Sequence, residues 1–448
     1  MSSPRRPPLR QLGGLLSLYG SRLAGVLVTL IFLPLYARLL GKHDFGLVAL
    51  LMSAQALMMM LDLGMAALAS RDLAASPHPG AARARWRRAE QLLTLYFAIL
   101  AVPALIVTWF TEQALLLGAG CVVLCWAVTL QSLSQAAMLA RGDVHRAALL
   151  QGGGVLCRAA LTAAALQWIE PSLRVFVASQ LVGALAHLAI SRHVGQPRHQ
   201  DEVGIEAEPL RRLAHRGLPL FFMGAAGAAV LQVDKLLVGS FMSPAAVTPY
   251  FLATTFCLTP IAVLAGPVAQ FFQPRLVRAY ASDDHATLCR QTDQLTLALL
   301  VTVIAPTLVL WVAREPLIAW WLQDRQLAVQ VAALAAVLLP AAAIGAVGNV
   351  PLALLIAQAD FGFQARLSIM LTTLTLLAVA VAAWQGQLLA VCGVYLAYYA
   401  TLTIAIWVRA ARHPATADPA RRSAILVLAV VGVIGVLAAA GAAVVHFL

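Results

Sequence analysis

The stretch LAVQVAALAAVLLPAAAIGAVGNVPLALLIA, residues 327–357, contains no charged side chain. About 20 consecutive apolar residues suffice for a helix to span the hydrocarbon core of a bilayer, and this run is longer. Similar continuous runs recur along the chain, whereas a transmembrane β-barrel would show alternating segments of about ten residues. Because backbone polar groups must pair internally in lipid, these runs predict transmembrane α-helices. A break within residues 327–357 is expected near either Pro340 or Pro351.

The composition of the whole chain agrees with this interpretation. Its 448 residues are 61% hydrophobic and 11% charged, whereas soluble domains are about half apolar and a quarter charged. We therefore expect an all-α polytopic membrane protein with about 13 transmembrane helices, each of roughly 20 residues or more. The expected spans are 12–40, 45–69, 89–111, 114–140, 146–168, 172–191, 216–241, 247–272, 291–313, 327–357, 364–384, 388–408 and 423–447.

The distribution of arginine and lysine predicts the orientation of the chain in the membrane. If the N-terminus is cytoplasmic, roughly 23 of these residues fall on the cytoplasmic side and roughly 5 on the other. We therefore expect a multi-pass protein of the bacterial cytoplasmic (inner) membrane with its N-terminus in the cytoplasm. The same distribution explains the net charge of +12 without a nucleic-acid partner.

The longest loop divides the predicted spans into two sets of six. It runs from His193 to Arg212 and is acidic in its middle. We expect an N-lobe at 1–192, a cytoplasmic linker at 193–215, a C-lobe at 216–410 and an extra C-terminal transmembrane helix at 411–448. Leu33–Gly41 and Leu231–Gly239 are similar ends of the first and seventh spans, which indicates a parallel repeat with a pathway between the lobes.

The chain lacks the sequence motifs of several enzyme classes. Its only lysines, Lys42 and Lys235, do not occur in a phosphate-binding P-loop. No His-Glu-x-x-His metal motif and no serine nucleophile elbow occur, and the six cysteines lack metal-ligand spacing. We therefore expect no catalytic residues, no metal and no cofactor, and we interpret the chain as a transporter and not an enzyme.

Charged residues inside the predicted spans are the candidate functional residues. A charge at the bilayer centre costs about 2.5–3.5 kcal/mol, so it faces a polar cavity or another charge, or it snorkels to the headgroups. Arg22 and Arg158 lie deep enough for us to expect them in a central cavity. For Asp62, Asp234 and Lys235, both a cavity and a snorkelling position remain open. Cations outnumber acids in this set, and arginine binds phosphate oxygens well, so the set favours an anionic substrate.

Several stretches resemble the polysaccharide transporter (Wzx-like) flippase family. Leu33–Gly41, Phe45–Ala49 and Leu61–Gly64 followed by Arg71 resemble the signature of its N-terminal half. Val233–Gly239, Pro249-Tyr250 and Gln273–Tyr280 resemble the pattern that opens its second half. The family belongs to the multidrug/oligosaccharidyl-lipid/polysaccharide exporter superfamily.

The resemblance implies two six-helix lobes in a MATE-like V around a central cavity. It also implies movement of an undecaprenyl-diphosphate-linked oligosaccharide, a unit of O-antigen, capsule or exopolysaccharide, from the cytoplasmic to the periplasmic leaflet. The expected partners are this anionic lipid-linked oligosaccharide and the lipid bilayer. Other polysaccharide-assembly membrane proteins are further candidate partners. We expect the substrate to meet the five intramembrane charges and Arg38, and we expect the cytoplasmic rim to be formed by Arg71, Arg275 and Arg366.

The chain departs from the family pattern in two places, and two other functions remain open. Family members usually have twelve or fourteen spans, and Ser243–Tyr250 lacks the acidic residue and glycine that commonly precede the tyrosine. A cation-coupled multidrug exporter on the same fold is one alternative, although it should carry acidic residues in its cavity. A membrane glycosyltransferase or polymerase is the other, although the predicted outer loops are short.

Overall fold

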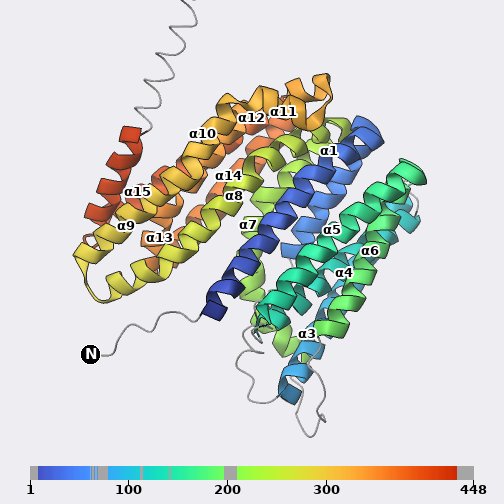
Figure 1. The fold of residues 1–448 in the computed structure, drawn as a ribbon, viewed down its shortest axis with the longest axis horizontal. Coiled ribbons are helices and arrows are strands. Elements are labelled where there is room, and N and C mark those ends of the chain that lie inside the picture. The colour runs from blue at the N-terminus through green and yellow to red at the C-terminus, as the bar shows by residue number, and fades with distance from the viewer. Residues whose placement is uncertain are drawn as a thin grey trace, which may run out of the picture. The chain divides into compact units, whose positions relative to one another are not determined.

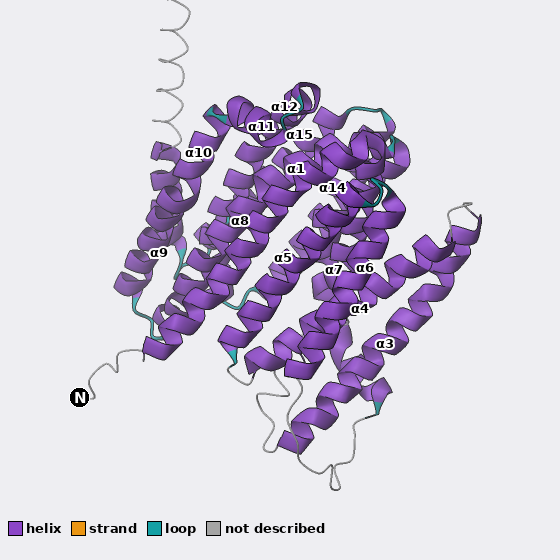
Figure 2. Ribbon diagram, turned by 45° about the vertical axis from the view of Figure 1, so that its right-hand side comes forward, coloured by secondary structure: helices purple, strands orange, loops and turns teal. Residues whose placement is uncertain are grey.

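The computed structural model describes residues 9–60, 62, 65, 68, 79–110, 115–140, 143–195 and 209–430. Within these residues all regular structure is helical, and they contain no strand (Figures 1 and 2). Nine helical stretches among them are long and apolar enough to cross a membrane, judged by length and composition. The predicted fold class, an all-α polytopic membrane protein, is confirmed.

The chain forms two compact units, unit 1 (Met1–Phe251) and unit 2 (Leu252–Leu448). Helix α8 (Pro244–Ala281) crosses the boundary between them. Residues 196–208 of the predicted linker lie outside the described residues, and so does the last predicted span beyond residue 430. The lobe boundaries derived from the sequence therefore stay predictions.

Unit 1 contains the helices that correspond to the first seven predicted spans. α1 packs against α5 and α7, and α4 packs against α3 and α6. Trp86, Leu93, Leu124 and Leu188 are among the buried side chains that fill the core between α3, α4 and α6. The helices are α1 (Leu9–Met60), α3 (Pro79–Phe110), α4 (Leu115–Ala140), α5 (Val144–Trp168), α6 (Leu173–Gly195) and α7 (Leu210–Phe241).

The predicted turn between the first two spans is a break inside α1. Gly41 adopts φ 73°, a left-handed conformation that glycine reaches without strain from a Cβ. Just beyond it, a Cβ on Gly46 would overlap the backbone of Pro244, so the start of α8 approaches α1 closely only because residue 46 is glycine. The Thr248 hydroxyl donates to the carbonyl of Lys42 at 2.6 Å and closes this contact.

Unit 2 is organised around two long helices, α12 and α15, which pack against each other. α12 also contacts α10 and α11, and α15 contacts α13 and α14. The segments are α9 (His285–Leu299), the π-helical η1 (Leu300–Ile304), α10 (Ala305–Val312), α11 (Arg314–Leu322), α12 (Arg325–Val347), α13 (Asn349–Ala357), α14 (Phe361–Trp384) and α15 (Leu388–Arg412).

Proline explains two irregularities in unit 2. Pro306 has no N–H and its ring crowds the carbonyl one turn earlier, and the chain immediately before it widens into the π-helical segment η1. The run 327–357 is interrupted at Gly348, between α12 and α13. This is one turn before Pro351, whose missing N–H removes a helical hydrogen bond, whereas α12 continues through Pro340.

The ends of two helices in unit 2 are joined by a salt bridge. Asp360 caps α14 by accepting from the backbone N–H of Phe363, and its Oδ2 lies 2.8 Å from Nε of Arg409 on α15. The hydrogen bond from Arg409 lowers the pKa of the Asp360 carboxyl below its ordinary value. This pair fixes the end of α14 against α15.

Candidate functional site

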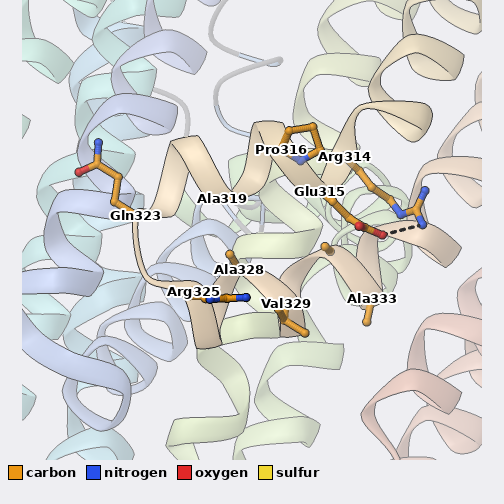
Figure 3. Close-up of a pocket in the computed structure, with 10 residues that line it drawn as sticks. Arg314, Glu315, Pro316, Ala319, Gln323, Arg325, Ala328, Val329 and Ala333 are labelled. Atoms are coloured by element: carbon orange, nitrogen blue, oxygen red, sulfur yellow. Dashed lines mark hydrogen bonds and ion pairs between the residues drawn. The ribbon is translucent and has the colours of Figure 1, made fainter.

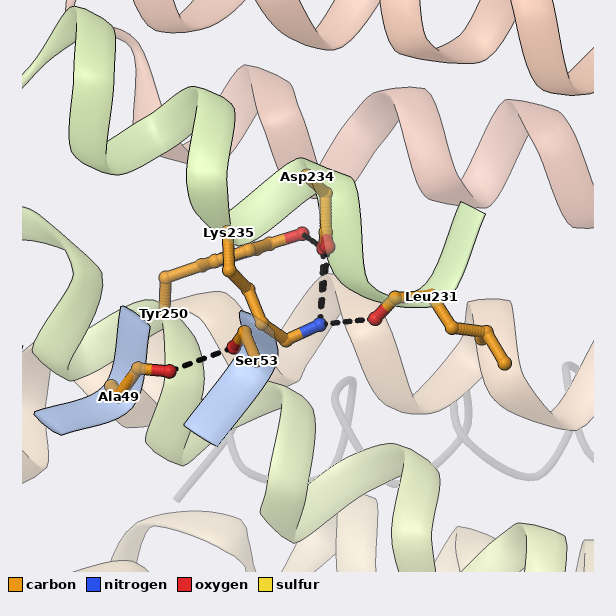
Figure 4. A network of polar contacts seen from close by, with 6 residues as sticks. All are labelled: Ala49, Ser53, Leu231, Asp234, Lys235 and Tyr250. Carbon is orange, nitrogen blue, oxygen red and sulfur yellow. Dashed lines mark hydrogen bonds and ion pairs between the residues drawn. The ribbon is translucent and has the colours of Figure 1, made fainter. Parts of the chain in front are cut away.

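Asp234 and Lys235, both on α7, form a buried ion pair with each other (Figure 4). Nζ of Lys235 lies 3.1 Å from Oδ1 of Asp234 and donates to the carbonyl of Leu231 at 2.6 Å. Tyr250 on α8 donates its hydroxyl to the other carboxylate oxygen at 2.6 Å. The exposed fractions of Asp234 and Lys235 are only 1% and 6%. The two charges therefore compensate each other within the protein.

This ion pair lies where α7 packs on the second half of α1. Ser53 of α1 is buried beside the network and donates its hydroxyl to the carbonyl of Ala49 at 2.8 Å (Figure 4). Nearby, a Cβ on Gly239 would overlap the side chain of Leu50, so α7 and α1 are in close contact. In the similar stretch at the end of the first predicted span, the basic residue Arg38 is instead exposed.

Arg158 lies on α5 against α6, in the interior of unit 1. Its side-chain carbons rest on Gly183 of α6, where an added Cβ would lie 3.0 Å from Cγ of Arg158. Nη1 of Arg158 is buried and has no hydrogen-bond partner among the described residues. An unpaired guanidinium nitrogen in a membrane span is costly, so it is available for an anion that enters the site.

His187 on α6 completes this site, and the sequence interpretation missed it. Its exposed fraction is 6%, and its Nδ1 has no hydrogen-bond partner in the described part of the chain. The imidazole lies against Gly154 of α5 and is close enough to Arg158 for an electrostatic interaction. A histidine within the apolar span 172–191 was a visible signal, but its position beside Arg158 depends on how α5 packs on α6.

Neutral polar groups continue from Arg158 toward α1. Thr162 lies one turn beyond Arg158 on the same face of α5. Ser179 and Gln180 of α6 donate to its hydroxyl at 3.2 Å each. Tyr36 of α1 donates to the carbonyl of Ala159 at 2.8 Å and interacts electrostatically with Arg158. We name the set the Arg158 cluster: Tyr36, Arg158, Thr162, Ser179, Gln180 and His187.

The remaining predicted site residues are separated from the Arg158 cluster or fall outside the description. Arg22 lies on α1, but its side chain is outside the described part, and Arg71 lies outside the described residues altogether. Asp62 is half-buried and interacts electrostatically with Tyr96.

The two described rim residues bond to their own helices. Arg275 on α8 donates to the carbonyl of Phe271 at 2.9 Å, and its guanidinium lies 3.4 Å from the centre of that ring. Arg366 on α14 is exposed and donates to the carbonyl of Gly362 at 3.2 Å. Their role at a cytoplasmic rim stays a prediction.

No metal site is visible in the ranges that the structure describes, since no three His, Cys, Asp or Glu side chains are grouped there. A guanidinium and an imidazole can hold an anion, and the hydroxyl and amide groups can exchange hydrogen bonds with a polar, uncharged ligand.

One family model matches the sequence over residues 12–280, and its description is "Polysaccharide biosynthesis protein". The match covers all of the Arg158 cluster and the Asp234–Lys235 pair. No curated protein matches the chain.

Several solved structures share the fold at low sequence identity. An inward-facing multidrug resistance MATE family transporter of the MOP superfamily superposes with a TM-score of 0.68 at 12% identity, covering 91% of this chain and 98% of that one. The lipid II flippase MurJ, in an inward closed conformation, gives 0.65 at 11% identity, with coverages of 93% and 92%. A MOP superfamily transporter from Pyrococcus furiosus gives 0.58 at 12%, with coverages of 92% and 96%.

Proposed function

The chain belongs to the polysaccharide biosynthesis protein family, and from this premise we propose that it carries a lipid-linked oligosaccharide across the membrane. Its fold is shared by transporters and by a lipid flippase. The proposed substrate is an undecaprenyl-diphosphate-linked unit of O-antigen, capsule or exopolysaccharide. The substrate moves from the cytoplasmic to the periplasmic leaflet by alternating access of two lobes around a central cavity.

The single observation that carries this proposal is the unpaired, buried guanidinium nitrogen of Arg158. A diphosphate offers the charged acceptor oxygens that such a nitrogen lacks, and charge-assisted bonds of this kind are about twice as strong as neutral ones. Thr162, Ser179 and Gln180 lie next to it and supply hydroxyl and amide groups suited to a sugar.

The balance of charge in the spans of unit 1 supports an anionic substrate. Asp234 is compensated by Lys235, and Glu90 on α3 is compensated by Arg192 on α6. Arg158 has no such carboxylate partner among the described residues. Outward movement of an anion is favoured by about 2.3 kcal/mol per charge per 100 mV when the cell interior is negative.

A multidrug exporter is the second candidate, because a multidrug resistance MATE family transporter shares the fold over nearly the whole chain. A site for cationic drugs needs a carboxylate that is free to bind the cation. Asp234 and Glu90 are both paired with cations of the protein itself, which favours the lipid-linked anion, and Asp62 is the acid on which a cationic drug would depend.

Location and partners are part of the same proposal. We place the protein in the bacterial inner membrane with a cytoplasmic N-terminus, on the strength of the arginine and lysine distribution.

The cavity would be lined by Arg22, Asp62 and Arg38 in addition to the Arg158 cluster. The Asp234–Lys235 pair would border this cavity, and the rim would carry Arg71, Arg275 and Arg366. Other polysaccharide-assembly membrane proteins are further candidate partners.

The test is the substitution Arg158→Gln in a strain whose surface glycan depends on this protein. We expect export to fall roughly tenfold to a hundredfold, since a hydrogen bond to a charged group contributes about 1.5–3 kcal/mol. Arg158→Lys should restore part of the export, because it keeps the charge and loses the planar fork. The measurement is surface glycan per cell at matched protein level, together with the lipid-linked unit that accumulates inside.

Arg174→Gln is the matched control, because Arg174 lies at the start of α6 in the same unit and is exposed. It should export like the wild type. Full export by Arg158→Gln at equal protein level would contradict the proposal. Loss of export by both variants to the same degree would assign the effect to general damage.

A further inference from the structure

A pocket of about 660 Å³ lies between α11 and α12 in unit 2, whereas the Arg158 cluster belongs to unit 1 (Figure 3). Arg314 and Arg325 contribute its cationic groups, one from the start of each helix. Glu315 and Gln323 contribute its other polar groups. The rest of the lining is apolar and includes Val329 and several alanines of α12.

The two arginines keep hydrogen-bonding capacity that the protein does not use. Nη1 of Arg314 donates to the carbonyl of Trp311 at 2.7 Å, and Nη2 lies 3.3 Å from the carboxylate of Glu315. Its Nε is buried without a partner among the described residues. Arg325 lines the pocket, and the structure records no ion pair for it within the described ranges. Two arginines and one glutamate thus line the pocket, and the side chain of Glu315 is 73% exposed.

The pocket lies at the first residue of a helical stretch that is long and apolar enough to cross a membrane, where we expect lipid headgroups to meet the protein. Arg325 is the first residue of the apolar stretch Arg325–Ala357. Trp320 on α11 is 75% exposed, as is typical of tryptophan at a membrane interface. Val329 is 66% exposed one turn further into the span. Cationic groups at the rim and an apolar wall directed into the span match a ligand with a phosphate on a hydrocarbon tail.

We propose that the pocket between α11 and α12 binds a membrane lipid through its phosphate group. Arg325 and Arg314 hold the phosphate oxygens, and the lipid tail lies along Val329 and the alanine face of α12. The site is separate from the proposed transport site and does not depend on it. A soluble phosphate would leave the apolar wall unused, so the ligand is the lipid.

The test measures lipid binding to the purified full-length protein by native mass spectrometry, with phosphatidylglycerol as the probe. We expect phosphatidylglycerol to remain bound to the wild type. Arg325→Gln should weaken lipid binding about fivefold, which corresponds to the contribution of one arginine near an anionic headgroup. Arg325→Lys keeps the charge and should retain most of the binding. Val329→Asn should also weaken binding, because it makes the wall of the pocket polar.

Arg174→Gln is again the matched control, since Arg174 likewise lies in the first turn of an apolar span. It should bind phosphatidylglycerol like the wild type. Equal weakening by Arg174→Gln and Arg325→Gln would show general headgroup attraction and overturn the proposal. Displacement of the lipid by millimolar inorganic phosphate would overturn the assignment to a lipid. Unchanged binding by both Arg325→Gln and Val329→Asn would rule the pocket out.

Discussion

At the scale of single residues, the charges within the spans of unit 1 divide into compensated and uncompensated groups. Asp234 is held by Lys235 and Tyr250, and all three side chains are buried. Arg158 keeps a buried nitrogen without a partner in the described part of the chain. The first arrangement favours a structural role, whereas the second leaves binding capacity for a ligand.

The ion pair of α7 gives a prediction about stability. Removing one partner of a buried pair leaves an uncompensated charge and typically costs about 3–5 kcal/mol. Asp234→Ala and Lys235→Ala should therefore each lower the thermal unfolding temperature strongly in detergent. The double variant Asp234→Asn/Lys235→Met has no charge to compensate and should be more stable than either single variant.

A double variant that is no more stable than the single ones would contradict the view that compensation of charge is what the pair contributes to stability. Export by the double variant separates structure from function. Normal export would indicate that the pair only stabilises the contact between α7 and α1. Lost export in a stable double variant would support the earlier expectation that these charges bind substrate.

The sequence identified Arg158, Asp234 and Lys235 as unusual because charges in apolar runs are conspicuous. It could not show that Asp234 and Lys235 pair with each other, because neighbours in a helix usually point in different directions. His187 was visible as a histidine in an apolar span, but its place beside Arg158 across the α5–α6 interface depends on tertiary packing.

At the scale of the helix, α5 and α6 each place a polar side chain against a glycine of the other helix. Arg158 of α5 rests on Gly183 of α6, and His187 of α6 rests on Gly154 of α5. Glycine removes the side-chain layer between two helices and lets their backbones approach. The helix pair thus holds both members of the candidate anion site in place.

This reciprocal packing predicts the effect of a single methyl group. Gly154→Ala should destabilise the protein by about 1–3 kcal/mol, the usual cost of overpacking, because the added Cβ overlaps the imidazole of His187. The double variant Gly154→Ala/His187→Ala should regain most of the lost unfolding temperature, because the ring is gone. Thermal unfolding of the two variants in detergent is the measurement.

Gly153→Ala is the control, since no atom lies within 4 Å of a Cβ built at Gly153. It should unfold close to the wild-type temperature. A double variant as unstable as Gly154→Ala alone would show that the clash involves a different part of α6.

Helix positions follow well from apolar run length, and the helix irregularities follow less well. The predicted break in residues 327–357 was placed near either of two prolines, and the structure has it at Gly348, one turn before Pro351. The π-helical segment before Pro306 has no signal in the apolar pattern, because hydropathy does not distinguish hydrogen-bond registers. The turn at Gly41 was predicted from sequence, but the close approach of Pro244 to Gly46 depends on tertiary packing.

At the scale of the whole molecule, the chain forms two compact units and belongs to the polysaccharide biosynthesis protein family. Composition together with the continuous apolar runs was enough to predict an all-α membrane protein. The similarity to MATE and MurJ structures, at 11–12% identity, shows the fold and leaves the substrate to be decided by the residues of the site. Those residues favour an anion, and the family assignment favours a polysaccharide precursor.

The most direct measurement is translocation by the purified full-length protein in vesicles. Vesicles would contain an undecaprenyl-diphosphate-linked oligosaccharide with a fluorescent sugar, and a membrane-impermeant quencher would report the leaflet in which the sugar lies. We predict that the protein moves the labelled lipid between leaflets faster than protein-free vesicles do, and that Arg158→Gln slows this movement about tenfold or more. Movement no faster than in protein-free vesicles, with a cationic dye transported instead, would contradict the account.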